Sequence, residues 1–189
     1  NPETNYYLEY RFTNNWGTGE WSRIEFVTTT NPEINIDMSS AEDSSGINFA
    51  ATGCEGLGEW QTVKESSLAE GDAAYAYPKG LVEFNLLGCP LGGQATISIT
   101  FTIDLDPSTT TFRKFNRSTR SFISLVSANS GLVISRTTLD GKAAITATYS
   151  LTDGGPLDQD GEVNGEILDP VGLAQLLVNA PNTGLKAEK

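Results

Sequence analysis

The chain has 189 residues, with 24 acidic and 12 basic side chains and a formal net charge of -12. This length is enough to bury a hydrophobic core, while the negative charge opposes binding to nucleic acids and to anionic membrane surfaces. The sequence contains no histidine, which excludes Ser-His-Asp and Cys-His catalysis and nearly every zinc site but leaves carboxylate-only chemistry such as that of glycosidases.

The first thirty residues predict a β-hairpin. Polar and apolar residues alternate over 6–12 and again over 22–30, and turn-forming residues lie between them at 14–19. The Pro-x-Thr-x-Tyr start, the Trp21-Ser22 pair and the Phe-x-Thr-Thr end resemble the last two strands of a fibronectin type III domain. The resemblance implies that the chain begins inside a domain whose earlier strands are missing. Two strands alone are marginally stable in water, so we expect them to pair with other strands.

Residues 31–46 are expected to be a linker, because Asn31-Pro32 interrupts the chain and a polar stretch covers 39–46, although residues 34–38 alternate like a strand. Strands are predicted around 47–51, 81–86, 95–103, 123–126, 132–136 and 143–151. Residues 66–76 are predicted as a short helical turn or coil, and 171–178 as a short helix or strand. Many short strands with Gly, Asp and Asn turns indicate an all-β fold, an antiparallel β-sandwich.

The two cysteines, Cys54 and Cys89, each follow a glycine in a turn-like setting. In an oxidising compartment they would form a disulfide, and the alternative is two unrelated buried thiols. No apolar run approaches the roughly 18 residues of a membrane span. The N-terminus also lacks an export signal, so we expect any such signal to lie outside this sequence.

The segment 153–169 contains six carboxylates and no basic residue. Such crowding is self-repulsive unless something offsets the charge, and calcium is the cation that takes six to eight oxygen ligands. The segment is similar to the first half of an EF-hand loop but has aspartate at the twelfth position, so a different calcium loop is expected. A solvated acidic loop without an ion is the alternative. The candidate ligands are Asp153, Asp158, Asp160, Asn164 and Asp169.

Residues 47–172 resemble the choice-of-anchor U domain of bacterial surface proteins. The resemblance rests on three motifs: Gly80-Leu81-x-x-Phe84, Gly88-Cys89-x-x-Gly92-Gly93, and Thr152-Asp153-Gly154-Gly155 leading to Asn164-Gly165-x-Ile167-x-Asp169-Pro170. It implies a position just before a C-terminal sorting or anchoring signal and no enzymatic activity. The Arg-rich segment within 107–140 departs from the family. The tail 173–189 contains Pro-x-Thr-Gly at 181–184, which is similar to a wall-sorting pentapeptide with Ala in the first place; a disordered tail is the alternative.

Two further residue groups are candidate binding sites. Trp16, Trp21 and Trp60 are candidates for stacking on sugar rings, with core packing as the alternative. A basic segment is a candidate for binding an acidic loop or an anionic glycan, with a solvated face as the alternative; it consists of Arg113, Lys114, Arg117 and Arg120. Asp104 and Asp106 are weaker candidates for a pair of glycosidase carboxylates.

The sequence therefore predicts a non-catalytic, extracellular structural or adhesive module on a bacterial cell surface. Its expected partners are neighbouring copies of itself, other surface proteins or glycans, and strand addition at the hairpin offers a route to a fibre. Nucleic acid is not an expected partner. A calcium-dependent carbohydrate-binding module is the alternative function.

Overall fold

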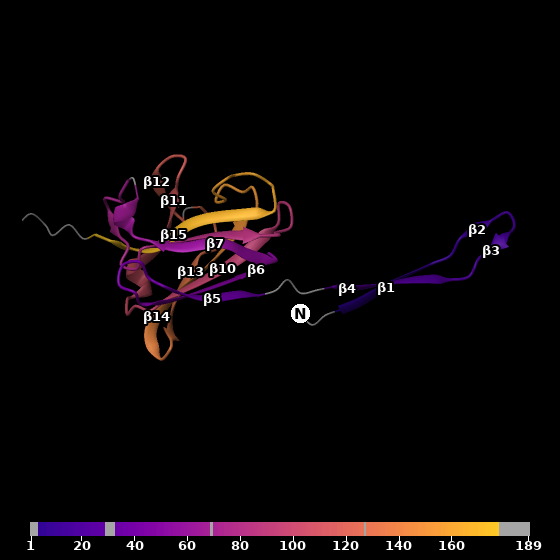
Figure 1. Cartoon of the computed structure of the whole chain (residues 1–189), viewed down its shortest axis with the longest axis horizontal. Coiled ribbons are helices and arrows are strands. Elements are labelled where there is room, and N and C mark those ends of the chain that lie inside the picture. The colour runs from indigo at the N-terminus through magenta and orange to yellow at the C-terminus, as the bar shows by residue number, and fades with distance from the viewer. Residues whose placement is uncertain (1–3, 29–32, 69, 127, 178–189) are drawn as a thin grey trace, which may run out of the picture. The chain divides into compact units, whose positions relative to one another are not determined.

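The computed structural model describes residues 4–28, 33–68, 70–126 and 128–177. It divides into two compact units, with the boundary between Asn31 and Pro32. The first unit is the predicted hairpin, in which β1 (Thr4–Tyr10) pairs with β4 (Ser22–Thr28) and a small extension is formed by β2 (Thr13–Asn14) and β3 (Gly17–Thr18) (Figure 1).

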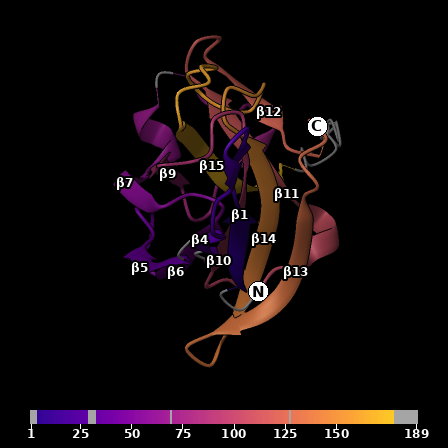
Figure 2. The same ribbon diagram turned by 90° about the vertical axis from the view of Figure 1, so that its right-hand side faces the viewer.

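The second unit is an antiparallel β-sandwich, which confirms the predicted fold class. The first sheet has the order β13 (Val133–Leu139), β14 (Lys142–Thr152), β10 (Gln94–Phe101), β6 (Gly46–Thr52) and β5 (Ile34–Ser39). The second has the order β12 (Ser121–Ser124), β11 (Thr110–Asn116), β15 (Glu166–Leu176), β9 (Leu81–Leu87) and β7 (Gly56–Val63), with the short β8 (Tyr75–Ala76) beside β15. The two sheets face each other in Figure 2.

The core forms because alternating residues of both sheets point inward. In β10, for example, Ala95, Ile97, Ile99 and Phe101 are buried, whereas the intervening threonines and serine face outward. Aromatic side chains from opposite sheets meet in the middle: the ring centroids of Phe49 and Phe84 are 4.7 Å apart, and those of Phe112 and Tyr149 are 5.5 Å apart. These contacts fix how the sheets pack on each other.

Two expected boundaries differ from the structure. The expected linker 31–46 contains β5, which pairs with β6 as an edge strand of the first sheet because Ile34 and Met38 are buried in the core. The expected tail 173–189 begins inside β15, where Leu173 and Ala174 are buried. The Pro-x-Thr-Gly motif at 181–184 lies outside the described residues.

The two ambiguous segments have different structures. At 66–76, a single turn of 3-10 helix, η1 (Glu65–Ser67), overlaps the start and the strand β8 forms the end, and the described residues between them are neither helix nor strand. A second 3-10 turn, η2, covers Pro107–Thr109 before β11. The apolar run at 171–176 belongs to β15 and is therefore strand.

Candidate functional site

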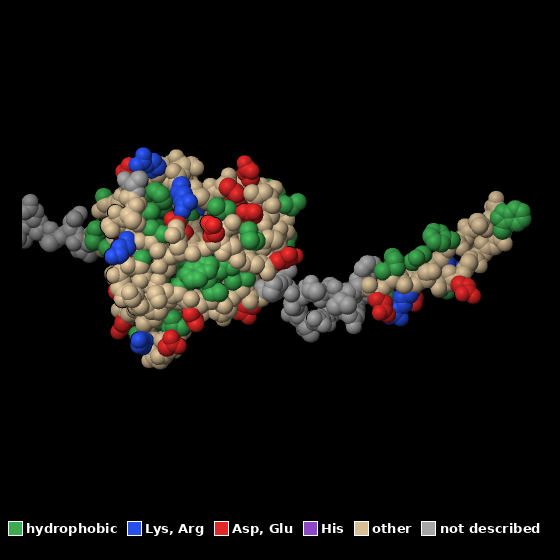
Figure 3. All heavy atoms as spheres, viewed as in Figure 1, with side chains coloured by type: hydrophobic (Ala, Val, Ile, Leu, Met, Phe, Trp, Pro, Cys, Tyr) green, Lys and Arg blue, Asp and Glu red, His purple; other side chains and the backbone are tan. Residues whose placement is uncertain are grey.

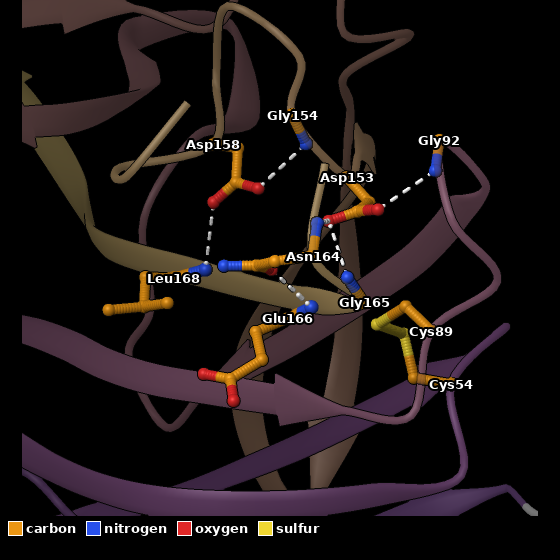
Figure 4. The surroundings of a disulfide bond; sticks show 10 residues. All are labelled: Cys54, Cys89, Gly92, Asp153, Gly154, Asp158, Asn164, Gly165, Glu166 and Leu168. Carbon is orange, nitrogen blue, oxygen red and sulfur yellow. Dashed lines mark hydrogen bonds between the residues drawn. A yellow bond between two sulfur atoms is a disulfide. The ribbon is translucent and has the colours of Figure 1, made fainter. Parts of the chain in front are cut away.

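A disulfide joins the two connections that cross between the sheets at one end of the sandwich. Cys54 lies between β6 and β7, Cys89 lies between β9 and β10, and their sulfur atoms are bonded, as predicted (Figure 4). Gly53 precedes the first cysteine with a φ of 101°, and a Cβ there would lie 2.5 Å from the carbonyl oxygen of Gln94. Only glycine allows the chain to pass this close to β10.

Asp153 connects this disulfide turn to the acidic loop that follows β14. Its side chain is buried, and its Oδ2 accepts the N–H of Gly92 at 2.8 Å. Its Oδ1 accepts the N–H groups of Asn164 at 3.2 Å and Gly165 at 3.1 Å (Figure 4). The backbone of Cys89 in turn donates to the carbonyl oxygen of Gly165 at 2.9 Å. One carboxylate therefore holds three segments together; we call Cys54, Cys89 and Asp153, with the backbone groups that bind them, the closing cluster.

The neighbouring acidic side chains also accept N–H groups. The two oxygens of Asp158 accept the backbone N–H groups of Gly154 and Leu168, each at 3.0 Å. Asp160 accepts the backbone N–H of Glu162 at 2.9 Å and the side-chain amide of Asn164 at 3.0 Å. These donors offset the negative charge of the loop, because hydrogen bonds to a carboxylate stabilise its charged form.

The environments of Asp153 and Asp158 shift their pKa values in opposite directions. Burial opposes the charge of Asp153, but its three backbone donors outweigh burial, so its pKa lies below the ordinary value. For Asp158, burial is the largest influence, and the nearby charge of Asp160 adds to it; the pKa is raised despite two backbone donors. Of these two carboxylates, Asp153 is therefore the one whose charge the fold stabilises.

The five predicted calcium ligands do not converge on one point. Among the described residues, no three His, Cys, Asp or Glu side chains form a group suited to a metal ion. The oxygens of Asp153, Asp158 and Asp160 face N–H donors, Asn164 uses its Oδ1 to accept the N–H of Glu166 at 2.8 Å, and Asp169 lies in the core. In this structure hydrogen bonds engage the oxygens of the acidic loop, and calcium binding by these residues stays a prediction.

Replacing Asp153 by asparagine is expected to lower the melting temperature by several degrees at neutral pH, because the charge that binds three N–H groups is lost. A lowered pKa means that the carboxylate stabilises the fold above its ordinary value of about 4, and that this contribution is lost as the pH falls through the lowered value. The difference between wild type and variant, measured by thermal melts, should therefore shrink below about pH 4.

Two controls belong with this measurement. Asp160→Asn, at an exposed position in the same loop, should have a much smaller effect. Melts with added calcium and with a chelator test the predicted calcium loop, and an unchanged wild-type melting temperature would favour hydrogen bonding alone. A chelator-induced drop comparable to that of Asp153→Asn would support the calcium site.

Asp169 takes part in a buried polar group that the sequence did not reveal. It lies on β15, and its Oδ1 is 2.5 Å from the Nζ of Lys114 on β11. Its Oδ2 accepts the hydroxyl of Tyr149, on β14 of the opposite sheet, at 2.7 Å. We call Lys114, Tyr149 and Asp169 the core triad. Its only signal in the sequence is the alternation of β11, which places Lys114 on the same face as the buried Phe112.

The other members of the basic segment are paired within the chain. Arg113 binds Asp72 at 2.7 Å, Arg117 binds Glu83 at 2.7 Å, and Arg120 binds Glu70 at 3.4 Å. Arg113 also stacks on the ring of Tyr75, 4.2 Å from its centroid. These carboxylates offset the positive charge of the segment, and binding of an acidic loop or an anionic glycan by it stays a prediction. The exposed Asp104 and Asp106 bind Arg136 and the N–H of Ser108, respectively.

The three tryptophans do not form one platform within either unit. Trp16 and Trp21 belong to the hairpin, where both are exposed, and Trp21 stacks with Arg11. Trp60, on β7, is 45% exposed and lines a groove of about 590 Å³ on the second sheet. The same groove is lined by Gln61, Glu83, Asn85 and Arg117. It is the one place in the sandwich where a predicted stacking residue adjoins polar side chains.

Comparisons with protein-family models, with curated proteins and with solved structures found no match. The resemblances to the choice-of-anchor U domain and to fibronectin type III therefore stay predictions. Over the residues that the structure describes, no helix has the length and hydrophobicity required to span a bilayer.

Proposed function

We propose that this chain provides a non-catalytic, extracellular structural or adhesive module of a bacterial surface protein. The observation that carries the proposal is the closing cluster, in which a disulfide and a buried carboxylate tie together the connections between two sheets. Disulfides persist in oxidising environments outside the cytosol, and a sandwich locked at its end resists unfolding when it links other segments. The resemblance to surface-protein domains supports a bacterial cell-surface location.

The hairpin supports a role in assembly with neighbouring copies. Leu8 and Ile24 are directly paired, so they share one face, and both are exposed. The opposite face carries Glu9 and the Arg23–Glu25 ion pair, and Figure 3 shows hydrophobic side chains along one side of the hairpin and charged ones along the other. Among the described residues, no third strand extends the β1–β4 pair. Its free edges and apolar face suit strand addition by another copy.

Sedimentation of the purified full chain tests this assembly. We expect oligomers whose size increases with protein concentration, and we expect Leu8→Lys to shift the distribution to monomer because it places a charge on the apolar face. Tyr7→Lys adds the same charge to the opposite face, between Glu9 and Glu25, and should leave assembly intact. A chain that remains monomeric at every concentration would contradict fibre formation through the hairpin.

The groove beside Trp60 favours carbohydrate binding as a second function. An exposed indole gives a flat apolar surface for a sugar ring, and the amide and charged groups around it can bind hydroxyls. Gln61 donates to Glu83 at 2.7 Å, which fixes both side chains, while the Oδ1 of Asn85 is buried without a partner among the described residues. The calcium dependence expected for this second function stays a prediction.

A glycan array probed with the wild-type chain tests this second function. If the groove binds sugar, Trp60→Ala should reduce binding at least tenfold, because stacking on the indole is lost. Trp21→Ala, in the hairpin, serves as the matched control and should bind like wild type. Absence of binding across the array, or equal loss in both variants, would favour the scaffold alone.

A further inference from the structure

The core triad lies in a site closed to solvent. Lys114 provides an amine, Asp169 a carboxyl carbon that an amine can attack, and Tyr149 a hydrogen-bond donor. The side chains of Lys114 and Asp169 are 1% and 0% exposed, respectively. Of the ion pairs between described residues, no other has both side chains this deeply buried; the Arg113–Asp72 pair, for comparison, is 13% and 10% exposed. An amine and a carboxyl are thus held in contact without competing water.

The strand register explains how the two side chains meet. Lys114 pairs with Val171 across the β11–β15 ladder, so Asp169 occupies the diagonal position two residues away on the same core-facing side. A lysine side chain is long enough to reach such a diagonal neighbour. The Nζ of Lys114 also donates to the carbonyl oxygen of Leu168 at 3.3 Å, which holds the amine beside the carboxyl group.

Tyr149 supplies the third element of the site. Its hydroxyl donates to the Oδ2 of Asp169, the carboxyl oxygen that does not face the amine. Burial, followed by the charge of Asp169, raises the pKa of Tyr149 well above its ordinary value, so the hydroxyl remains a donor at neutral pH. A donor in this position stabilises negative charge on Oδ2 when a nucleophile adds to the carboxyl carbon.

Burial also favours a neutral product over the ion pair. Removing an ammonium and a carboxylate from water costs several kcal/mol for each ion, and their attraction recovers this cost only in part. An amide formed from the same two groups carries no charge, and it keeps a carbonyl oxygen for the Tyr149 hydroxyl and one N–H for the carbonyl oxygen of Leu168.

We propose that Lys114 and Asp169 form an intramolecular amide cross-link between β11 and β15. The Nζ of Lys114 bonds to the Cγ of Asp169 while the bond from Cγ to Oδ1 breaks. Two protons of the ammonium leave with Oδ1 as water, and the third stays on the amide nitrogen. Oδ2, held by Tyr149, becomes the amide oxygen. The step is a condensation that needs no oxidant, reductant or co-reactant.

Mass spectrometry of the full chain, denatured and with its disulfide reduced, tests the cross-link. The expected mass is one water molecule lower than the sequence mass, and a protease digest should contain the Lys114 peptide joined to the Asp169 peptide. Asp-Gly pairs at 140–141, 153–154 and 160–161 can also lose water, so the joined peptide is the decisive species. A chain with the full sequence mass, whose two peptides separate after digestion, would overturn the proposal.

Three variants sharpen the result. Lys114→Arg keeps a buried cation but removes the amine, so the joined peptide should disappear. Asp169→Asn should yield the same joined peptide by loss of ammonia in place of water. Tyr149→Phe should lower the cross-linked fraction at a fixed time after folding, because the donor to Oδ2 is missing. Because the wild-type digest is decisive by itself, a variant that fails to fold leaves the test intact.

Discussion

Replacement of Asp169 by leucine is expected to lower the free energy of unfolding by about 3–5 kcal/mol, the usual cost of leaving one partner of a buried ion pair uncompensated. Lys114 would remain as a buried ammonium with only the Leu168 carbonyl as acceptor, and the Tyr149 hydroxyl would lose its acceptor. Chemical denaturation of wild type and variant measures the difference. The loss is expected whether the wild-type pair is ionic or covalent, because both forms satisfy the amine.

A combined variant separates two causes of the lost stability: a buried polar group without a partner, and poorer packing of the core. Lys114→Met, Asp169→Leu and Tyr149→Phe together remove every member of the core triad while retaining apolar side chains, and replacing a whole buried polar group in this way is often close to neutral. We expect the combined variant to be more stable than Asp169→Leu, because it leaves no buried charge without a partner. A combined variant no more stable than Asp169→Leu alone would contradict an electrostatic origin of the loss.

Removal of the disulfide is expected to destabilise the sandwich by about 3 to 4 kcal/mol, the value that the chain-entropy relation gives for a loop of this length. The loop between Cys54 and Cys89 spans 35 positions and includes β7, η1, β8 and β9. The Cys54→Ser/Cys89→Ser double variant, compared with wild type by denaturation under oxidising conditions, measures the contribution.

Reductant provides the matching control for this variant. It should destabilise wild type by a similar amount and leave the double variant unchanged, since no other cysteine is present in the sequence. If the double variant melted like the oxidised wild type, the hydrogen bonds of Asp153 alone would suffice to close this end of the sandwich.

The sequence was most informative where a repeating pattern records the environment of each side chain. The alternation over 95–101 predicts β10 because its inward residues are apolar and its outward residues are small and polar. The same signal at 34–38 identified a strand, but the neighbouring Pro32 and the polar residues after Met38 favoured a linker. Membership of β5 in the sheet depends on its pairing with the next strand, β6, which the pattern within 34–38 does not specify.

The hydrogen bonds of the acidic loop could not be predicted, because composition records charge but not the direction of backbone N–H groups. Asp153 binds Gly92, which is 61 positions earlier in the chain, and no spacing rule within the loop indicates that contact. The core triad was missed for a related reason. Lys114 lies in a run of basic residues that reads as a solvated face, and only the fold brings it to Asp169.

The position of Leu168 links the acidic loop to β15, a central strand of the second sheet. The β11–β15 ladder begins at Val171, so the preceding part of β15 has no β11 residue beside it. There the loop replaces the missing strand. Asp158 accepts the N–H of Leu168 at 3.0 Å, and the N–H of Gln159 donates to the carbonyl oxygen of Leu168 at 3.0 Å. The loop thus covers the backbone of Leu168, so that a strand of another chain cannot pair with it there. Covering an unpaired strand in this way opposes aggregation.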